Sequence, residues 1–141
     1  MNEEMDKLRT KVCKYVLYKK RTEKEVQQKF AEVPQDMLEE ILEDLKESGY
    51  ISDTDYIEKA VDEFMRLKSL SIRELRYKLI AKGLGKNLIE EYFDKNWDAL
   101  REYEKASAEK LIQKKSKSKS LEEIKKYLMT KGYSTDIINL Y

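Results

Sequence analysis

The 141-residue sequence is short of four kinds of residue: it has no histidine, one cysteine, one proline and four glycines. Without histidine, the chain cannot build a Ser-His-Asp triad, a histidine general base or a histidine metal site. The single thiol, Cys13, excludes a disulfide within the chain. Scarce proline and glycine leave few residues that interrupt helices. These absences argue against the common hydrolytic and metal-dependent enzymes and favour helical structure.

Long apolar runs are absent as well. No segment approaches the roughly 20 apolar residues that a helix needs to cross a bilayer, and the N-terminus lacks the apolar stretch of a secretory signal. We therefore expect a cytoplasmic protein that makes no membrane contact. Nothing in the sequence requires a cofactor or a metal, and we expect a monomer.

Charged residues make up 40% of the chain, and Lys, Glu, Leu and Ile recur throughout. Most of these residues are good helix formers, so the composition predicts an all-α protein. The net charge is only +1, but residues 100–141 carry 10 basic and 6 acidic groups. A basic C-terminal third permits binding to phosphates or to an acidic protein groove.

Three segments share one pattern: Ser or Thr, two residues, Glu, and an apolar residue. They begin at Thr22, Ser71 and Ser120, so neighbouring starts are 49 residues apart. In such a capping box the hydroxyl accepts a hydrogen bond from an amide at the helix start, and the Glu carboxylate accepts one from the cap amide. Gly83 and Gly132 keep the same register, where a helix would end in a left-handed turn. Three boxes at equal spacing predict an internal repeat.

Each repeat is predicted to contain three helices. We expect helices at about residues 4–19, 23–32, 35–48, 54–68, 72–82, 87–95, 97–115 and 121–131, with a short one from 135. The fold class is therefore all-α, with three tandem three-helix repeats at residues 1–52, 53–96 and 97–141. Because each repeat has a small core, we expect the repeats to pack end to end in an elongated, right- or left-curved array.

Features that could suggest catalysis have simpler explanations. Paired carboxylates such as Glu39-Glu40 and Glu90-Glu91 point outward in different directions on amphipathic helices, whereas a catalytic pair needs a shared pocket. The segment Gly83-Leu84-Gly85-Lys86 lacks the Walker spacing and a preceding strand, so we interpret it as a turn. We do not expect an enzyme.

The basic residues between Phe64 and Leu88 outnumber the acidic ones seven to one. On the helix at 72–82 they flank the inward face, and basic residues of the third repeat occupy the same places. We call the candidate partner- and nucleic-acid-binding set the cationic stripe: Arg66, Lys68, Arg73, Arg76, Lys82, Lys86, Lys125, Lys126 and Lys131. Such a stripe can follow phosphates or an acidic surface, and its replacement should spare the fold. The alternative is that these side chains only keep the surface soluble.

Several short segments, in this order and at this spacing, resemble the RecX family of RecA modulators. The matching segments are Arg21-Thr22-Glu23-Lys24-Glu25-Val26, Gly49-Tyr50-Ile51-Ser52-Asp53, Arg73-Glu74-Leu75 with Lys82-Gly83-Leu84, Trp97-Asp98-Ala99-Leu100, and Lys131-Gly132-Tyr133-Ser134. One departure lies at residues 66–70, where many members have a glycine-rich basic turn and this chain has Arg66-Leu67-Lys68-Ser69-Leu70.

The resemblance implies a bacterial cytoplasmic protein that binds the RecA filament on DNA and restrains strand exchange, ATP turnover and coprotease activity. Its partners would be the RecA filament and, in weak and salt-sensitive contacts, single- or double-stranded DNA. The resemblance implies no catalytic site, in agreement with the residues. A second hypothesis stays open, which is a helical-repeat adaptor that binds another protein and makes no contact with nucleic acid.

Overall fold

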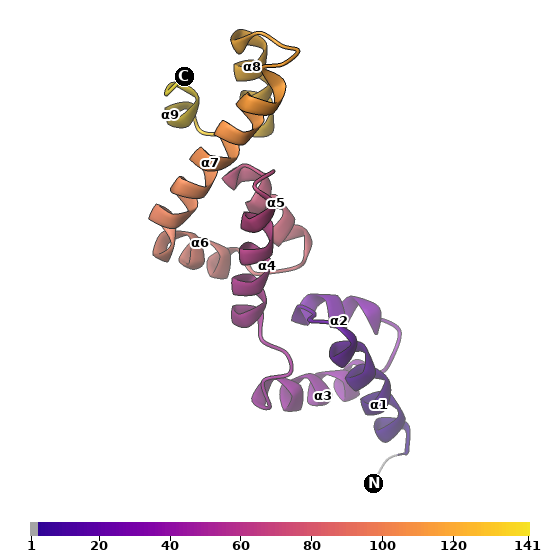
Figure 1. Ribbon diagram of the computed structural model, residues 1–141. Helices are drawn as coiled ribbons and strands as arrows, with labels where there is room; N and C mark the ends of the chain where they lie inside the picture. The colour runs from indigo at the N-terminus through magenta and orange to yellow at the C-terminus, as the bar shows by residue number, and fades with distance from the viewer. Residues whose placement is uncertain (1–2) are drawn as a thin grey trace. The chain divides into compact units, whose positions relative to one another are not determined.

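The computed structural model describes residues 3–141, and within that range all regular structure is helical (Figure 1). The all-α prediction is confirmed. The helices are α1 (Glu3–Tyr18), α2 (Glu23–Lys29), α3 (Gln35–Glu47), α4 (Asp53–Leu67), α5 (Ile72–Ala81), α6 (Lys86–Lys95), α7 (Trp97–Lys115), α8 (Leu121–Lys131) and α9 (Thr135–Ile138). Their bounds follow the predicted ranges closely, because capping residues and apolar periodicity already marked them.

The main difference is the end of α2, which stops at Lys29 although the prediction extended it to about residue 32. The chain after Lys29 forms a turn instead of more helix, and the side-chain amide of Gln35 holds that turn. Its Nε2 donates to the carbonyl oxygens of Phe30, Ala31 and Val33 at 3.2, 3.2 and 2.7 Å.

The chain divides into two compact units. Unit 1 is Met1–Ile57 with Lys82–Leu84, and unit 2 is Glu58–Ala81 with Gly85–Tyr141. The boundary between the two units falls inside α4. The predicted division into three repeats at residues 1–52, 53–96 and 97–141 stays an interpretation of the sequence.

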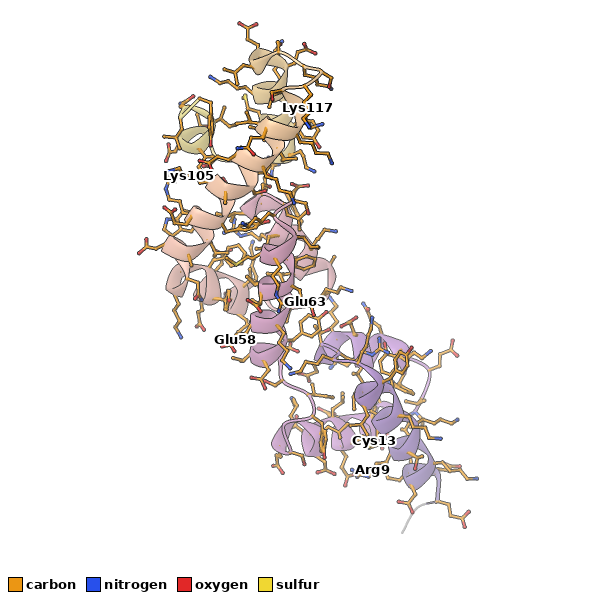
Figure 2. All side chains as sticks on the ribbon, viewed as in Figure 1. Arg9, Cys13, Glu58, Glu63, Lys105 and Lys117 are labelled. Carbon is orange, nitrogen blue, oxygen red and sulfur yellow. The ribbon has the colours of Figure 1, made fainter. Side chains whose placement is uncertain are left out.

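The core of unit 1 is formed by the apolar faces of α1, α2 and α3. Residues at i, i+3, i+4 and i+7 of α3 point inward, as the sequence predicted. The buried members are Leu8, Val12, Val16, Val26, Leu38, Ile41, Leu42, Leu45 and Ile51. Cys13, labelled in Figure 2, is half-buried beside this core.

Unit 2 buries two groups of apolar side chains. The first group includes Leu75 and Leu79 of α5, with Ile89 and Phe93 of α6 and Leu100 of α7. The second lies at the chain's C-terminal side and contains Ala108, Ile124, Leu128, Tyr133, Ile137 and Ile138. The nineteen-residue α7 contributes to both groups.

All three predicted capping boxes are present. The hydroxyls of Thr22, Ser71 and Ser120 accept from the amides three residues later at 3.0, 3.1 and 3.2 Å. The side chains of the three glutamates accept from the backbone amides of the cap residues, at 2.9, 3.1 and 3.3 Å in the same order. The cap prediction is therefore confirmed.

Two of the three cap hydroxyls also make a bond that the sequence did not predict. Within unit 1, Thr22 Oγ1 donates to the carbonyl oxygen of Lys82 at 2.6 Å. Within unit 2, Ser71 Oγ donates to the carbonyl oxygen of Lys131 at 2.7 Å. In both cases the partners are 60 residues apart, and both cap residues are fully buried. Ser120 is exposed, and its hydroxyl donates to its own Glu123 at 3.1 Å.

This difference predicts unequal effects of removing the three hydroxyls. Ser120→Ala should lower the free energy of unfolding by about 0.5–2 kcal/mol, the usual effect of losing a helix N-cap. Thr22→Ala and Ser71→Ala should each lower it by about 1–3 kcal/mol more, because a part-buried carbonyl also loses its donor. Urea denaturation of the three variants and the parent measures this. Equal effects at the three positions would contradict it.

Candidate functional site

The cationic stripe occupies the outward faces of several elements. Arg66 lies in the last turn of α4, and Lys68 follows that helix. Arg73 and Arg76 lie on α5, Lys82 directly after it, and Lys86 at the start of α6. The remaining members, Lys125, Lys126 and Lys131, lie on α8. Arg76, Lys125 and Lys131 are half-buried, and the other six are exposed.

Residues 66–70 contain an unusual backbone conformation. Lys68 has a φ of +49°, the only positive φ of a non-glycine residue in the described chain. This left-handed conformation is one that glycine adopts more easily than lysine. Arg66 pairs with Asp62 at 2.9 Å on an exposed surface, and the hydrogen bond that the guanidinium donates to Asp62 raises the pKa of Arg66.

Buried polar groups of α7 hold the segment between α4 and α5 in place. Tyr103 accepts from the amide of Leu70 at 3.1 Å and donates to its carbonyl at 2.6 Å. Ser107 donates to the carbonyl of Lys68 at 3.0 Å and shares a 2.6 Å hydrogen bond with Tyr133. Burial raises the pKa of the Tyr133 hydroxyl, so this bond stays neutral. These contacts fix where α5 begins, and so where Arg73 and Arg76 point.

A cleft of about 170 Å³ in unit 2 brings together arginines from α5 and α7. Its lining includes Arg73, Arg76 and Arg101, with the half-exposed indole of Trp97 and the carboxylate of Glu104. Two of these residues belong to the cationic stripe. The sequence did not predict that Trp97 and Arg101 would lie beside them, because they come from a different helix.

The arginines of this cleft differ in their contacts. Arg76 Nε lies 3.0 Å from Glu90 Oε1, and its guanidinium lies 4.9 Å from the centre of the Phe93 ring. Arg101 pairs with Asp136 at 3.5 Å. Arg73 is exposed, lies 5.8 Å from the Tyr77 ring and has no ion pair with a described acidic residue within 4.0 Å. Arg73 is thus the cleft arginine best placed to meet a partner's anion.

On α8 the stripe residues also differ. Lys131 Nζ lies 3.5 Å from Glu74 and 5.5 Å from the Tyr127 ring, whereas Lys126 is exposed. We expected that replacing any stripe residue would spare the fold. For Arg76 and Lys131 that expectation needs revision, because both side chains join α5 to a neighbouring helix. Arg73 and Lys126 remain suitable for testing function.

Glu104 is a residue that the sequence analysis missed. Its side chain is fully buried, and its two oxygens accept from the amides of Ile72 and Ser134, each at 2.8 Å. It thus places a carboxylate against the N-terminus of α5, where the helix dipole favours negative charge. The available signal was its spacing, since Glu104 follows the buried Leu100 by four residues and occupies a core position of α7.

The described residues hold no group of three or more His, Cys, Asp or Glu side chains arranged to bind a metal ion. None of the described helices combines the length and the apolar character that a membrane crossing needs. The candidate site is an array of outward cations beside half-exposed aromatic residues.

No family model matches the chain. Curated sequences do: it is 34% identical to the regulatory protein RecX of Staphylococcus carnosus over 130 residues, which is 89% of this chain and 49% of that protein. It is 33% identical to the RecX protein of Clostridium botulinum over 129 residues, which is 84% of this chain and 58% of that one. The crystal structure of RecX from Lactobacillus salivarius superposes with a TM-score of 0.79 and 28% identity, and the match covers 99% of this chain and 95% of that one. The chain belongs to the RecX family.

A second RecX crystal structure shares the fold, with a TM-score of 0.79 at 23% identity. The chain spans about half the length of the first curated RecX protein and somewhat more than half of the second. The resemblance stated from the short sequence segments is therefore confirmed for the family and for the fold.

Proposed function

We propose that this RecX-family chain is a non-enzymatic, cytoplasmic regulator that binds the RecA–DNA filament and lowers its recombinase, ATPase and coprotease activities. The observation that carries the proposal is the cluster around Arg73 in unit 2, where an exposed arginine lies beside a half-exposed tryptophan. Exposed cations next to aromatic surface are enriched where proteins meet acidic partners or nucleic acid. The family name supports RecA as the protein partner.

The charges on the stripe favour contacts that are weak and sensitive to salt. Its exposed members face water in the free protein: Arg66, Lys68, Arg73, Lys82, Lys86 and Lys126. Exposed charge contacts are screened over about 10 Å at 0.1 M salt, and each neutralised phosphate adds to the salt dependence. DNA contacts of this chain would therefore strengthen the binding of a filament without reading its sequence.

The adaptor hypothesis has an observation in its favour. Three stripe residues, Arg66, Arg76 and Lys131, have acidic partners within the chain. Their positive charge is partly compensated before any ligand arrives, as on an ordinary helical surface. An adaptor would bind another protein through α5 and α8 and would be indifferent to DNA.

Charge reversal at two exposed positions separates these functions. We expect Arg73→Glu and Lys126→Glu each to raise the concentration that gives half-maximal inhibition of RecA ATP turnover on single-stranded DNA. The double variant should raise it by about 5- to 50-fold, the effect of losing about 1–2.3 kcal/mol of binding free energy. The effect should weaken as salt rises from about 50 to 200 mM.

Lys105→Glu is the matched control, because Lys105 is an exposed lysine of α7 outside the stripe (Figure 2). It should leave the midpoint within about twofold of the parent. If the double variant keeps the parent midpoint and its helicity by circular dichroism, the stripe only solubilises the surface and the adaptor function is favoured.

A further inference from the structure

A second basic and aromatic surface lies in unit 1, on α1, α2 and the segment between them. Its lining is almost entirely apolar and aromatic at the floor, with cations around the rim. We call it the Tyr15 cradle, a hollow of about 450 Å³ lined by Lys11, Lys14, Tyr15, Arg21, Lys29 and Phe30, with Tyr18 at its edge. None of these residues belongs to the cationic stripe.

The floor of the Tyr15 cradle is built from planar groups that contact one another. The rings of Tyr15 and Phe30 meet edge to face, with centres 5.8 Å apart. The guanidinium of Arg21 lies over the Tyr15 ring, 3.9 Å from its centre, and its Nε donates to the Tyr15 carbonyl at 3.3 Å. This bond holds the guanidinium beside the Tyr15 ring before any ligand binds, which reduces the entropy that binding would cost.

The rim of the cradle carries uncompensated positive charge. Lys11, Lys14, Arg21 and Lys29 line it, and no acidic side chain does so among the described residues. Tyr18 is 83% exposed beside these cations, with its ring centre 6.0 Å from the Arg21 guanidinium carbon. An aromatic ring left this exposed gains little from burial within the chain itself, so it is available to a ligand.

This combination selects among polyanions. A peptide of Asp and Glu alone would use the four cations but has no aromatic ring to stack on Tyr18 or on the Arg21 guanidinium. A single nucleic-acid strand supplies both, since its phosphates pair with the cations and its unpaired bases stack on tyrosine and guanidinium planes. A duplex hides its bases within the stack and would use the rim alone.

We infer that the Tyr15 cradle binds single-stranded nucleic acid directly, in the absence of RecA, with a base stacked at Tyr18 and Arg21 and phosphates on Lys11, Lys14 and Lys29. This site is independent of the proposed filament regulation. It uses other residues, and it needs neither the recombinase nor ATP to be observed.

Fluorescence anisotropy of a labelled dT oligonucleotide with the full chain tests the cradle. Tyr18→Ala should raise Kd by about 5- to 100-fold, the effect of losing one stacked base worth about 1–3 kcal/mol. Lys14→Gln should weaken binding and reduce the slope of log Kd against log salt by about one. An abasic oligonucleotide of the same charge should bind more weakly than dT and should no longer respond to Tyr18→Ala.

Tyr50→Ala is the control, because Tyr50 is 60% exposed in the same unit and lies outside the cradle. It should leave Kd within twofold of the parent. Tyr18 is the last residue of α1 and is exposed, so its replacement should keep the parent's melting temperature. An unchanged Kd for a folded Tyr18→Ala overturns the inference. So does tighter binding of polyglutamate than of dT at equal charge, which would instead assign the cradle to an acidic peptide.

Discussion

Glu104→Ala is expected to lower the free energy of unfolding by about 3–5 kcal/mol. The substitution removes a buried carboxylate that accepts from the amides of Ile72 and Ser134, both at 2.8 Å. It leaves both amides without their charged acceptor, and each charged hydrogen bond contributes about 1.5–3 kcal/mol. Guanidinium denaturation followed by circular dichroism measures the loss.

Glu104→Gln should recover part of this stability. A glutamine is nearly isosteric, but only its carbonyl oxygen accepts, and its amide group would face one of the two N–H donors. We expect a loss of about 1.5–3 kcal/mol for this variant. Glu102→Ala is the control on the same helix, because Glu102 is exposed, and it should change stability by less than about 0.5 kcal/mol. Similar values for Glu102→Ala and Glu104→Ala would show that the buried carboxylate contributes little.

Glu104→Ala should also affect the arginine cleft. Glu104 lines that cleft and holds the first amide of α5, the helix that carries Arg73 and Arg76. Losing the bond should loosen the start of α5. The half-maximal concentration in the RecA ATPase assay should then rise even at temperatures where Glu104→Ala is still folded.

Gly83→Ala and Gly132→Ala are each expected to lower the free energy of unfolding by about 2–5 kcal/mol. Their φ angles are +92° and +91°, a region that costs an L-residue about 1–2 kcal/mol. A Cβ at Gly83 would lie 2.6 Å from Lys24 Cβ, and one at Gly132 would lie 2.6 Å from Arg73 Cδ and 2.9 Å from Arg73 Cβ. A Cβ atom moves only with its backbone, so overpacking adds about 1–3 kcal/mol.

The other two glycines separate the contributions of conformation and contact. Gly49 has a φ of +79° with nothing within 4 Å of an added Cβ, so Gly49→Ala should cost only the conformational part, about 1–2 kcal/mol. Gly85 has a φ of −65° and open space, so Gly85→Ala should be neutral or slightly stabilising. Thermal melts of the four variants should therefore rank Gly83 and Gly132 as most sensitive, then Gly49, then Gly85. If Gly83→Ala and Gly49→Ala lose equal stability, the close contact with Lys24 is not costly.

The sequence predicted the helices and their ends because both depend on local chemistry. Capping boxes at Thr22, Ser71 and Ser120 and the apolar spacing of α3 involve residues within one or two turns of each other. The family was also evident at this level, from short segments in a fixed order. The predicted end of α2 was wrong by three residues, because the chain after Lys29 forms a turn that the side chain of Gln35 holds from outside the helix.

The residues of the cationic stripe were proposed from the sequence, but their contacts with other helices were not. Helical spacing correctly kept these side chains off the inward faces. It could not show that Arg76 packs on Phe93 or that Lys131 pairs with Glu74, because those partners come from other helices. For the same reason it missed Trp97 and Arg101 beside Arg73.

Apart from the end of α2, the sequence by itself determined closely where helices begin and end and which face of each turns inward, since those properties follow from neighbours along the chain. Only the tertiary structure decided what the same motif does in each copy. Thr22 and Ser71 are buried and join helix ends 60 residues apart, whereas Ser120, with the same local sequence pattern, faces water. A hydroxyl can cap its own helix by local geometry alone, and Ser120 also finds its acceptor locally, on Glu123. The buried hydroxyls of Thr22 and Ser71 instead donate to carbonyls that only the tertiary structure brings near. The glycines that follow these two carbonyls, Gly83 and Gly132, lie so close to Lys24 and Arg73 that neither has room for a side chain.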